Sequence, residues 1–207
     1  MANGVVYTGS LDGNVYALNA DTGALLWKYT TGNIVQSSPA VVRGVVYIGS
    51  IDHNIYALDA GTGTLLWKYT TGNGVADSPA VANGVVYVAG YALTARTGAL
   101  LWTYAVLGSP AVANGVLYVA GAGNVYALNA VTGSLLWKYT TGGAVYSSPA
   151  VANGVVYVGS YDGNVYAFGL TGSDAPALPQ RPDPQTLSPD LSLPLSRPSA
   201  KLPATDE

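Results

Sequence analysis

Side chains that could carry out acid–base, nucleophilic or metal chemistry are scarce in this chain. Charged residues make up 9% of its 207 residues, cysteine is absent, and His53 is the only histidine. A zinc site or a catalytic nucleophile needs a second nitrogen, sulfur or base beside the first. His53 has no such partner, and its place in Asp52-His53-Asn54 indicates a turn residue. Without cysteine, disulfides and thiolate sites are excluded.

The aspartates recur at corresponding points of a repeated pattern: Asp12, Asp52 and Asp162 at one turn, and Asp21 and Asp59 near the next. A general acid and base must converge within about 5 to 10 Å, and a calcium site needs about 6 to 8 oxygen ligands. Because each repeat carries only one aspartate at each turn, we expect these carboxylates to be too dispersed for either task. Turn formation is the role that we predict for them.

A glycine-rich stretch, Gly121-Ala122-Gly123-Asn124, resembles a phosphate loop only superficially. It precedes a predicted strand, so it has no helix N-terminus to hold an anion. The sequence therefore predicts no catalytic, cofactor-binding or metal-binding residues.

The elements that carry these residues belong to an internal repeat. The phrase Gly-Val-Val-Tyr, once Gly-Val-Leu-Tyr, starts at residues 4, 44, 84, 115 and 154, with spacings of 40, 40, 31 and 39. Each unit continues through Val-Tyr-Ala-Leu-Asn-Ala, Thr-Gly, Leu-Leu-Trp-Lys-Tyr, Thr-Thr-Gly and Ser-Ser-Pro-Ala-Val. A repeat of this length and composition indicates one supersecondary unit per copy.

Turn signals divide each unit into four short strands. Asp12-Gly13 and Asp162-Gly163 predict type I′ hairpin turns between the second and third strands. Asp21-Thr22-Gly23 and the Thr-Thr-Gly phrases mark two further turns. The strands are apolar at both odd and even positions, which is typical of sheets covered on both faces.

These features predict an all-β fold, a β-propeller of four-stranded antiparallel blades. Helical repeats fit the Gly-rich, β-branched composition poorly, and the strands are too short for a membrane barrel. Counting strand phrases gives about four and a half blades. The alternatives are an imperfectly closed five-bladed ring, part of a larger ring, or half of a dimeric ring, since unpaired terminal strands favour association.

The repeat resembles the PQQ-type propeller repeat over about residues 3 to 172. That repeat occurs in PQQ-dependent alcohol dehydrogenases, in the propeller lipoprotein of bacterial outer-membrane assembly, and in sensor regions attached to bacterial kinases. The resemblance implies that the repeat tryptophans dock between adjacent blades: Trp27, Trp67, Trp102 and Trp137.

The dehydrogenases of that family imply a catalytic aspartate, acidic and amide calcium ligands, a tryptophan stacked beneath the quinone, and often a vicinal disulfide. The disulfide cannot form in this chain, and no residue can be matched to the other roles. The resemblance therefore predicts the fold without predicting the cofactor or an enzyme.

The third repeat is shorter than the others. Tyr87 and Tyr91 stand 4 residues apart where Tyr7 and Tyr16 stand 9 apart, so the Asp-Gly-Asn turn is missing. We expect that its hairpin cannot close normally and that this blade is the least stable. A deletion among recently copied repeats explains the gap most simply, and the alternative is a notch that opens a binding site.

The composition changes near Ser173, after which the chain is rich in proline and serine. We predict two regions, a propeller over residues 1–172 and a disordered tail or linker over 173–207. A spacer is the preferred role of this tail, and a ligand for a proline-recognising partner is the alternative.

Composition limits the partners. The net charge of −3 supplies no basic field for nucleic acid, and the apolar runs are too short to span a membrane as helices. No signal peptide is recognisable at the N-terminus. The compartment is therefore not predicted, although the resemblance implies a periplasmic or extracellular location if the chain is part of a longer protein.

We expect a non-catalytic scaffold or binding module whose partners are proteins or peptides, with homo-oligomerisation as a way to complete the ring. Tyrosine, with 16 copies, suits such a surface because it offers contact area and a hydroxyl at low entropic cost. The alternatives are a fragment of a PQQ-dependent dehydrogenase, a glycan-binding propeller lectin, and a recently amplified reading frame without a selected function.

Overall fold

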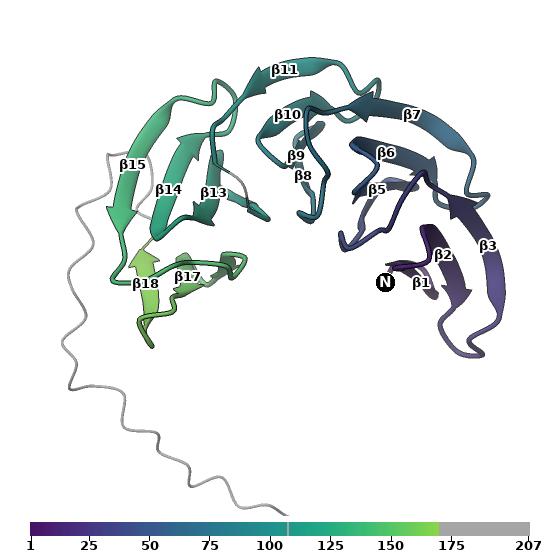
Figure 1. The fold of residues 1–207 in the computed structure, drawn as a ribbon, viewed down its shortest axis with the longest axis horizontal. Coiled ribbons are helices and arrows are strands. Elements are labelled where there is room, and N and C mark those ends of the chain that lie inside the picture. Colours follow the sequence, from purple (N-terminus) through teal and green to yellow (C-terminus); the bar gives the residue numbers. More distant parts are fainter. Residues whose placement is uncertain (107, 170–207) are drawn as a thin grey trace, which may run out of the picture.

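The computed structural model describes residues 1–106 and 108–169, which form 18 strands in five antiparallel sheets. Each sheet is one propeller blade, and the blades follow one another along an arc (Figure 1). The described residues contain no helix that could cross a membrane. The predicted all-β propeller is confirmed, while the predicted tail, 173–207, lies outside the described residues.

The strands of each blade are consecutive in the chain and pair with their sequence neighbours. Blade 1 contains β1 (Val5–Gly9), β2 (Asn14–Asn19) and β3 (Leu25–Thr30). Blade 2 contains β4 (Ala40–Val42), β5 (Val45–Ser50), β6 (Asn54–Asp59) and β7 (Leu65–Thr70). Blade 3 contains β8 (Ala80–Ala82), β9 (Val85–Val88), β10 (Tyr91–Thr94) and β11 (Leu100–Thr103). Blade 4 contains β12 (Ala111–Ala113), β13 (Val116–Gly121), β14 (Asn124–Asn129) and β15 (Leu135–Thr140). Blade 5 contains β16 (Ala150–Ala152), β17 (Val155–Gly159) and β18 (Val165–Gly169).

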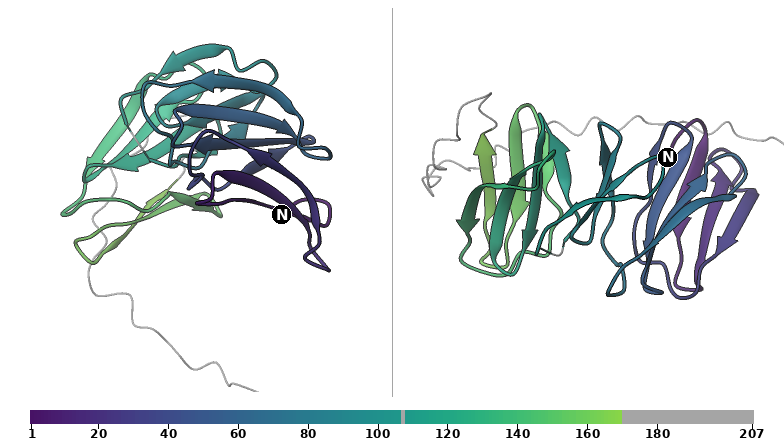
Figure 2. Two further views of the ribbon diagram at one scale, coloured as in Figure 1. Left: turned by 45° about the vertical axis from the view of Figure 1, so that its right-hand side comes forward. Right: turned by 90° about the horizontal axis from the view of Figure 1, so that it is seen from above.

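The arc of blades is open. Short strands such as β8 line its inner side, strands β3, β7, β11 and β15 form its outer side, and blades 1 and 5 stand at its two ends (Figure 1). Two further views show the same succession of blades packed face to face (Figure 2). Blade 1 keeps only a trace of an inner strand, a single bridge between Ala2 and Val5. The described blades therefore do not form a closed ring, and the three ring alternatives stay predictions.

The Asp-Gly hairpins do not have the turn type that the sequence predicts. In a type I′ turn both central residues have positive φ, but in blades 1 and 5 only Gly13 (φ 83°) and Gly163 (φ 84°) do, and the preceding aspartates do not. The amide of Ser10 bonds the carbonyl of Asn14 across a three-residue loop. Such loops combine a type I turn with one left-handed residue, so the prediction of type I′ turns at Asp12-Gly13 and Asp162-Gly163 is wrong.

The shortened hairpin of blade 3 closes with a genuine two-residue turn. Ala89 (φ 49°) and Gly90 (φ 86°) both adopt left-handed conformations, and Tyr91 pairs directly with Val88. Blade 3 therefore keeps all four strands, and the expectation that its hairpin cannot close normally is wrong. Relative to blade 2, the hairpin loop loses one residue and each of its two strands loses two.

The core lies between blades. Four clusters of buried apolar side chains fill the four contacts between successive blades. The tryptophans seal these contacts from the outer strands: Trp27 Nε1 donates to the Ala60 carbonyl (2.9 Å) and Trp67 Nε1 to the Ala95 carbonyl (2.9 Å) of the next blade. A Cβ on Gly98 would lie 2.6 Å from the Trp67 ring. The docking role that the resemblance implies for the tryptophans is confirmed at these positions.

Candidate functional site

The aspartates that recur at one rim of the arc form turns. Asp12, Asp52 and Asp162 each accept a hydrogen bond from the tyrosine four residues later, at 2.5, 2.5 and 2.6 Å. The Tyr166 hydroxyl lowers the pKa of Asp162 to about 2, because it stabilises the charged form. The Asp162 carboxylate also accepts the amide of Gly142 from the preceding blade (2.8 Å), so it ties two blades together as well as closing its own turn.

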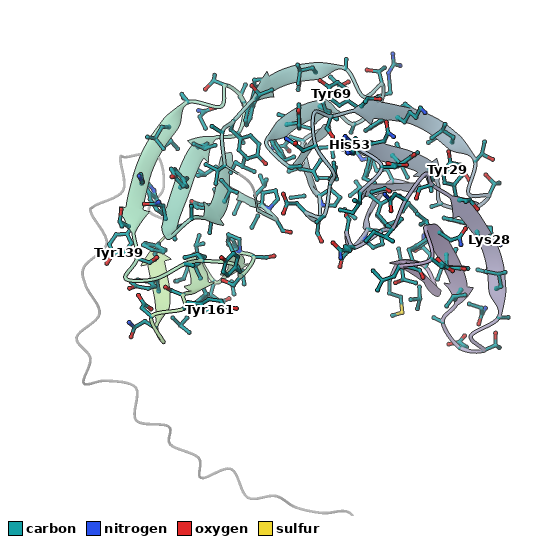
Figure 3. The ribbon with its side chains drawn as sticks, in the orientation of Figure 1. Lys28, Tyr29, His53, Tyr69, Tyr139 and Tyr161 are labelled. Atoms are coloured by element: carbon teal, nitrogen blue, oxygen red, sulfur yellow. The ribbon has the colours of Figure 1, made fainter. Side chains whose placement is uncertain are left out.

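The remaining sequence candidates also occupy turns. His53 is exposed in the blade 2 hairpin at φ 71° (Figure 3), and its carbonyl accepts the amide of Thr71 (2.8 Å). Asp59 caps the turn on the opposite rim by accepting the amides of Gly61 and Thr62, and the exposed Asp21 sits at the equivalent turn of blade 1.

The donor set does not fit the quinone and calcium of the dehydrogenases. In the described residues, no three His, Cys, Asp or Glu side chains come close enough to hold a metal ion together. The rim aspartates are spread over different blades, and their oxygens are already occupied by tyrosine hydroxyls and backbone amides. The described residues therefore do not match the calcium and quinone ligands that the resemblance implies for those enzymes.

Two hollows lie beside blade 3, on the rim that carries the shortened turns. One, of about 500 Å³, lies between blades 3 and 4 and is lined by Ala122, Tyr126 and Tyr146 among others. The other, of about 490 Å³, includes Gly90 and Tyr91. Each is lined by part of a shortened two-residue hairpin turn, Ala122 in the first hollow and Ala89 and Gly90 in the second, where blades 1, 2 and 5 have a longer loop. The shortening thus leaves the sheet intact and removes material from its rim.

Asp77 lines both hollows. It occupies the position of Ser37 and Ser147 in the Ser-Ser-Pro phrases of the neighbouring connections. Those serines bond to the hairpin of their own blade, as Ser147 does with Gly159, whereas Asp77 accepts the amide of Gly108 (3.1 Å). Burial raises the pKa of Asp77, since a half-buried carboxylate loses solvation.

Aromatic packing is also altered next to these hollows. In the other contacts an outer-strand tyrosine packs on a tyrosine of the next blade, as Tyr29 does on Tyr56 (5.6 Å) and Tyr69 on Tyr91 (5.5 Å). Tyr29 and Tyr69 lie on the outer strands β3 and β7 (Figure 3). Tyr104 turns instead toward Trp102, with ring centroids 5.7 Å apart. Among the described residues, its hydroxyl and Trp102 Nε1 are buried without hydrogen-bond partners. The Tyr126 ring forms part of the hollow wall, and Lys138 Nζ lies 5.5 Å from its centroid.

Sequence reasoning did not single out Asp77, Tyr104 or Tyr126. The one available signal was the Asp-Ser-Pro phrase at Asp77, where the other connections have Ser-Ser-Pro or Gly-Ser-Pro. Tyr104 lies in the connection from Trp102 to Pro110, which spans 8 residues where Trp27 to Pro39 spans 12, and its changed packing accompanies this shorter connection.

Comparison with known proteins finds a matching family model and similar solved structures. A family model described as outer membrane protein assembly factor BamB matches residues 11–91 and 89–196. A search of curated proteins gave no significant match. Among solved structures, BamB from Moraxella catarrhalis superimposes with a TM-score of 0.72 and 24% identity, over 82% of this chain and 56% of that one.

Two other structures share the fold at similar identity. The computationally designed protein Ika8 matches with a TM-score of 0.70 and 20% identity, over 82% of this chain and 56% of that one. The quinohemoprotein alcohol dehydrogenase ADHIIG from Pseudomonas putida HK5 matches with a TM-score of 0.65 and 23% identity, over 82% and 39%. The chain thus spans little more than half the length of the BamB structure, and at these identities the superpositions show the fold alone.

Proposed function

We propose, from the premise that this chain belongs to the BamB family of PQQ-like repeat propellers, that it is a non-catalytic module that binds a protein or peptide partner. We assign the propeller unit to residues 1–172. The name of the family, an assembly factor for outer membrane proteins, supports protein partners as the class of ligand. The repeat itself also occurs in dehydrogenases, so the proposal depends on the site.

The observation that carries the proposal is the pair of hollows that share Asp77. They combine a half-buried carboxylate with tyrosine rings, Tyr91 on one side and Tyr126 and Tyr146 on the other. Tyr146 is 78% exposed and makes an edge contact with Tyr161 (5.2 Å), so this aromatic surface is accessible to a large ligand. Carboxylates and tyrosine faces both attract lysine and arginine side chains. We therefore expect the partner segment to present a basic residue.

The surroundings of Asp77 favour a binding role. General acid–base chemistry needs two titratable groups within reach of one substrate, whereas among the described residues it is the backbone amide of Gly108 that donates to Asp77. A single carboxylate that lines both hollows suits recognition of a cation.

A phage-displayed library of random peptides tests this proposal. Peptides enriched on the folded chain should contain lysine or arginine, and their affinity, measured by fluorescence anisotropy, should fall at least tenfold in Asp77→Ser. That variant restores the residue type found at positions 37 and 147. Asp21→Ser removes a carboxylate from the opposite rim and should bind the peptides normally. No enrichment, or equal affinity for wild type and Asp77→Ser, overturns the proposal.

A further inference from the structure

Blade 1 ends the arc with a face that no other described blade covers. Because alternate residues of a strand point to opposite faces, and Tyr7 and Val15 pack toward blade 2, the side chains that point away are Val6, Thr8, Tyr16 and Leu18. None of these four is fully buried. Their counterparts in blade 2, which pack against blade 1, are buried: Val46, Ile48, Tyr56 and Leu58.

Blade 5 ends the arc with the opposite kind of face. Tyr157, Val165 and Ala167 point away from blade 4, and Tyr157 and Val165 are 40% and 62% exposed. The equivalent side chains in blade 2, Tyr47, Ile55 and Ala57, are at most 4% exposed because blade 3 covers them.

In their two middle strands, these faces match the two halves of the contact that the chain makes between its own blades. Among the described residues, blade 5 has no outer strand with a tryptophan to add to this contact. In three of those contacts the tyrosine equivalent to Tyr157 donates its hydroxyl to an alanine carbonyl of the next blade. The distances are 3.0 Å for Tyr7 to Ala60, 3.1 Å for Tyr47 to Ala95, and 2.8 Å for Tyr87 to Ala130. In blade 1 the alanine that corresponds to Ala60 is Ala20.

We propose that the free face of blade 5 binds the free face of blade 1 in a second copy of this chain. The occupant is a second copy because each face finds on the same chain the partner that it has in the internal contacts, down to a hydrogen bond from Tyr157 to the Ala20 carbonyl. No acidic or basic side chain stands among the outward-pointing residues named above, so no like charges oppose the contact. This inference is independent of the proposed peptide-binding function.

Such a contact is heterologous, because it joins two different surfaces. A heterologous contact builds a closed ring if its rotation closes and an open chain if it does not. In either case, every copy inside the assembly uses both its blade 1 face and its blade 5 face. Blocking one face leaves the other able to bind.

Sedimentation velocity of the 207-residue chain over a range of concentrations tests the association. The average sedimentation coefficient of the wild type should exceed that of the monomer and should rise with protein concentration. Val165→Glu on the blade 5 face and Thr8→Glu on the blade 1 face should each abolish association. Val131→Glu is the matched control, since Val131 is 79% exposed in a turn of blade 4 that belongs to neither face, and it should associate like the wild type.

Mixing the two blocked variants tests the head-to-tail geometry. Val165→Glu retains an intact blade 1 face and Thr8→Glu retains an intact blade 5 face, so an equimolar mixture should form a heterodimer and nothing larger. A wild type that is monomeric at every concentration overturns the proposal. A mixture that stays monomeric does so as well, because it shows that the two faces do not bind each other. Circular dichroism of each variant confirms that the blades are folded.

Discussion

A pair of matched tryptophan substitutions tests the packing between blades most sharply. Trp67 and Trp102 occupy the same position in successive blades, but only Trp67 donates its Nε1 hydrogen, to the Ala95 carbonyl, while Trp102 Nε1 is buried without a partner. Replacement by phenylalanine removes a similar apolar area at both sites. The two variants therefore differ chiefly in the fate of the indole N–H.

The expected difference follows from the cost of each N–H. Trp67→Phe loses a hydrogen bond worth about 1 kcal/mol net, and the Ala95 carbonyl keeps its bond from Tyr47. Trp102→Phe removes an unpaired buried donor, which relieves about 1–3 kcal/mol. Trp102→Phe should therefore be more stable than Trp67→Phe by about 2–4 kcal/mol, which corresponds to roughly 6–12 °C in Tm for a domain of this size.

Thermal unfolding followed by circular dichroism compares the wild type and both variants without relying on tryptophan fluorescence. Equal Tm values for the two variants, or a lower Tm for Trp102→Phe, would refute the assignment of a satisfied indole in blade 2 and an orphaned one in blade 3.

Three further outcomes follow from the same contacts. Gly98 has φ 70°, and a Cβ there would meet the Trp67 ring, so Gly98→Ala should lower the free energy of unfolding by about 2–5 kcal/mol. Gly23 has the same φ but no neighbour within 4 Å, so Gly23→Ala should lower it by only about 1 kcal/mol. Urea titrations measure both values, and equal losses would contradict the docking of Trp67. The folded-state pKa of Asp162 is about 2, below its ordinary value, so its stabilising contribution should be present above about pH 4 and be lost as the pH falls toward 2. In Asp162→Asn, the Tm should therefore fall less steeply as the pH is lowered over this range. An unchanged slope would count against the Tyr166 hydrogen bond. Burial raises the pKa of Asp77, so its charged form destabilises the fold at neutral pH. Asp77→Asn should raise the Tm at pH 7 but not below about pH 4, where the carboxyl is protonated in both the folded and the unfolded state. A lower Tm at pH 7 would contradict this reasoning.

The repeat pattern predicts the fold because each phrase repeats the same local chemistry. Glycine at the turns, both-face apolar strands and a tryptophan on the outer strand recur at fixed spacing, and these signals are local to each unit. The docking of Trp27 and Trp67 follows from the same repetition, because every blade must cover the next.

Features that depend on how two repeats or two strands are placed relative to each other could not be predicted from the repeat pattern. The Asp12-Gly13 loop has one residue more than a two-residue turn requires, and the register between strands, which the sequence does not specify, decides its type. The hollows and the altered packing of Tyr104 arise because two shortened connections meet in space. An open arc likewise depends on the angle between blades, which no single repeat encodes.

The central claim, a propeller that binds without catalysis, is tested most directly by titration with PQQ and calcium. Tryptophan fluorescence and calorimetry should show no saturable binding, because the carboxylates of the rim are dispersed over separate blades and in the described residues no cluster of three metal-ligating side chains exists. Tight, stoichiometric quenching that depends on calcium would contradict the claim and identify the chain as part of a quinone-dependent enzyme.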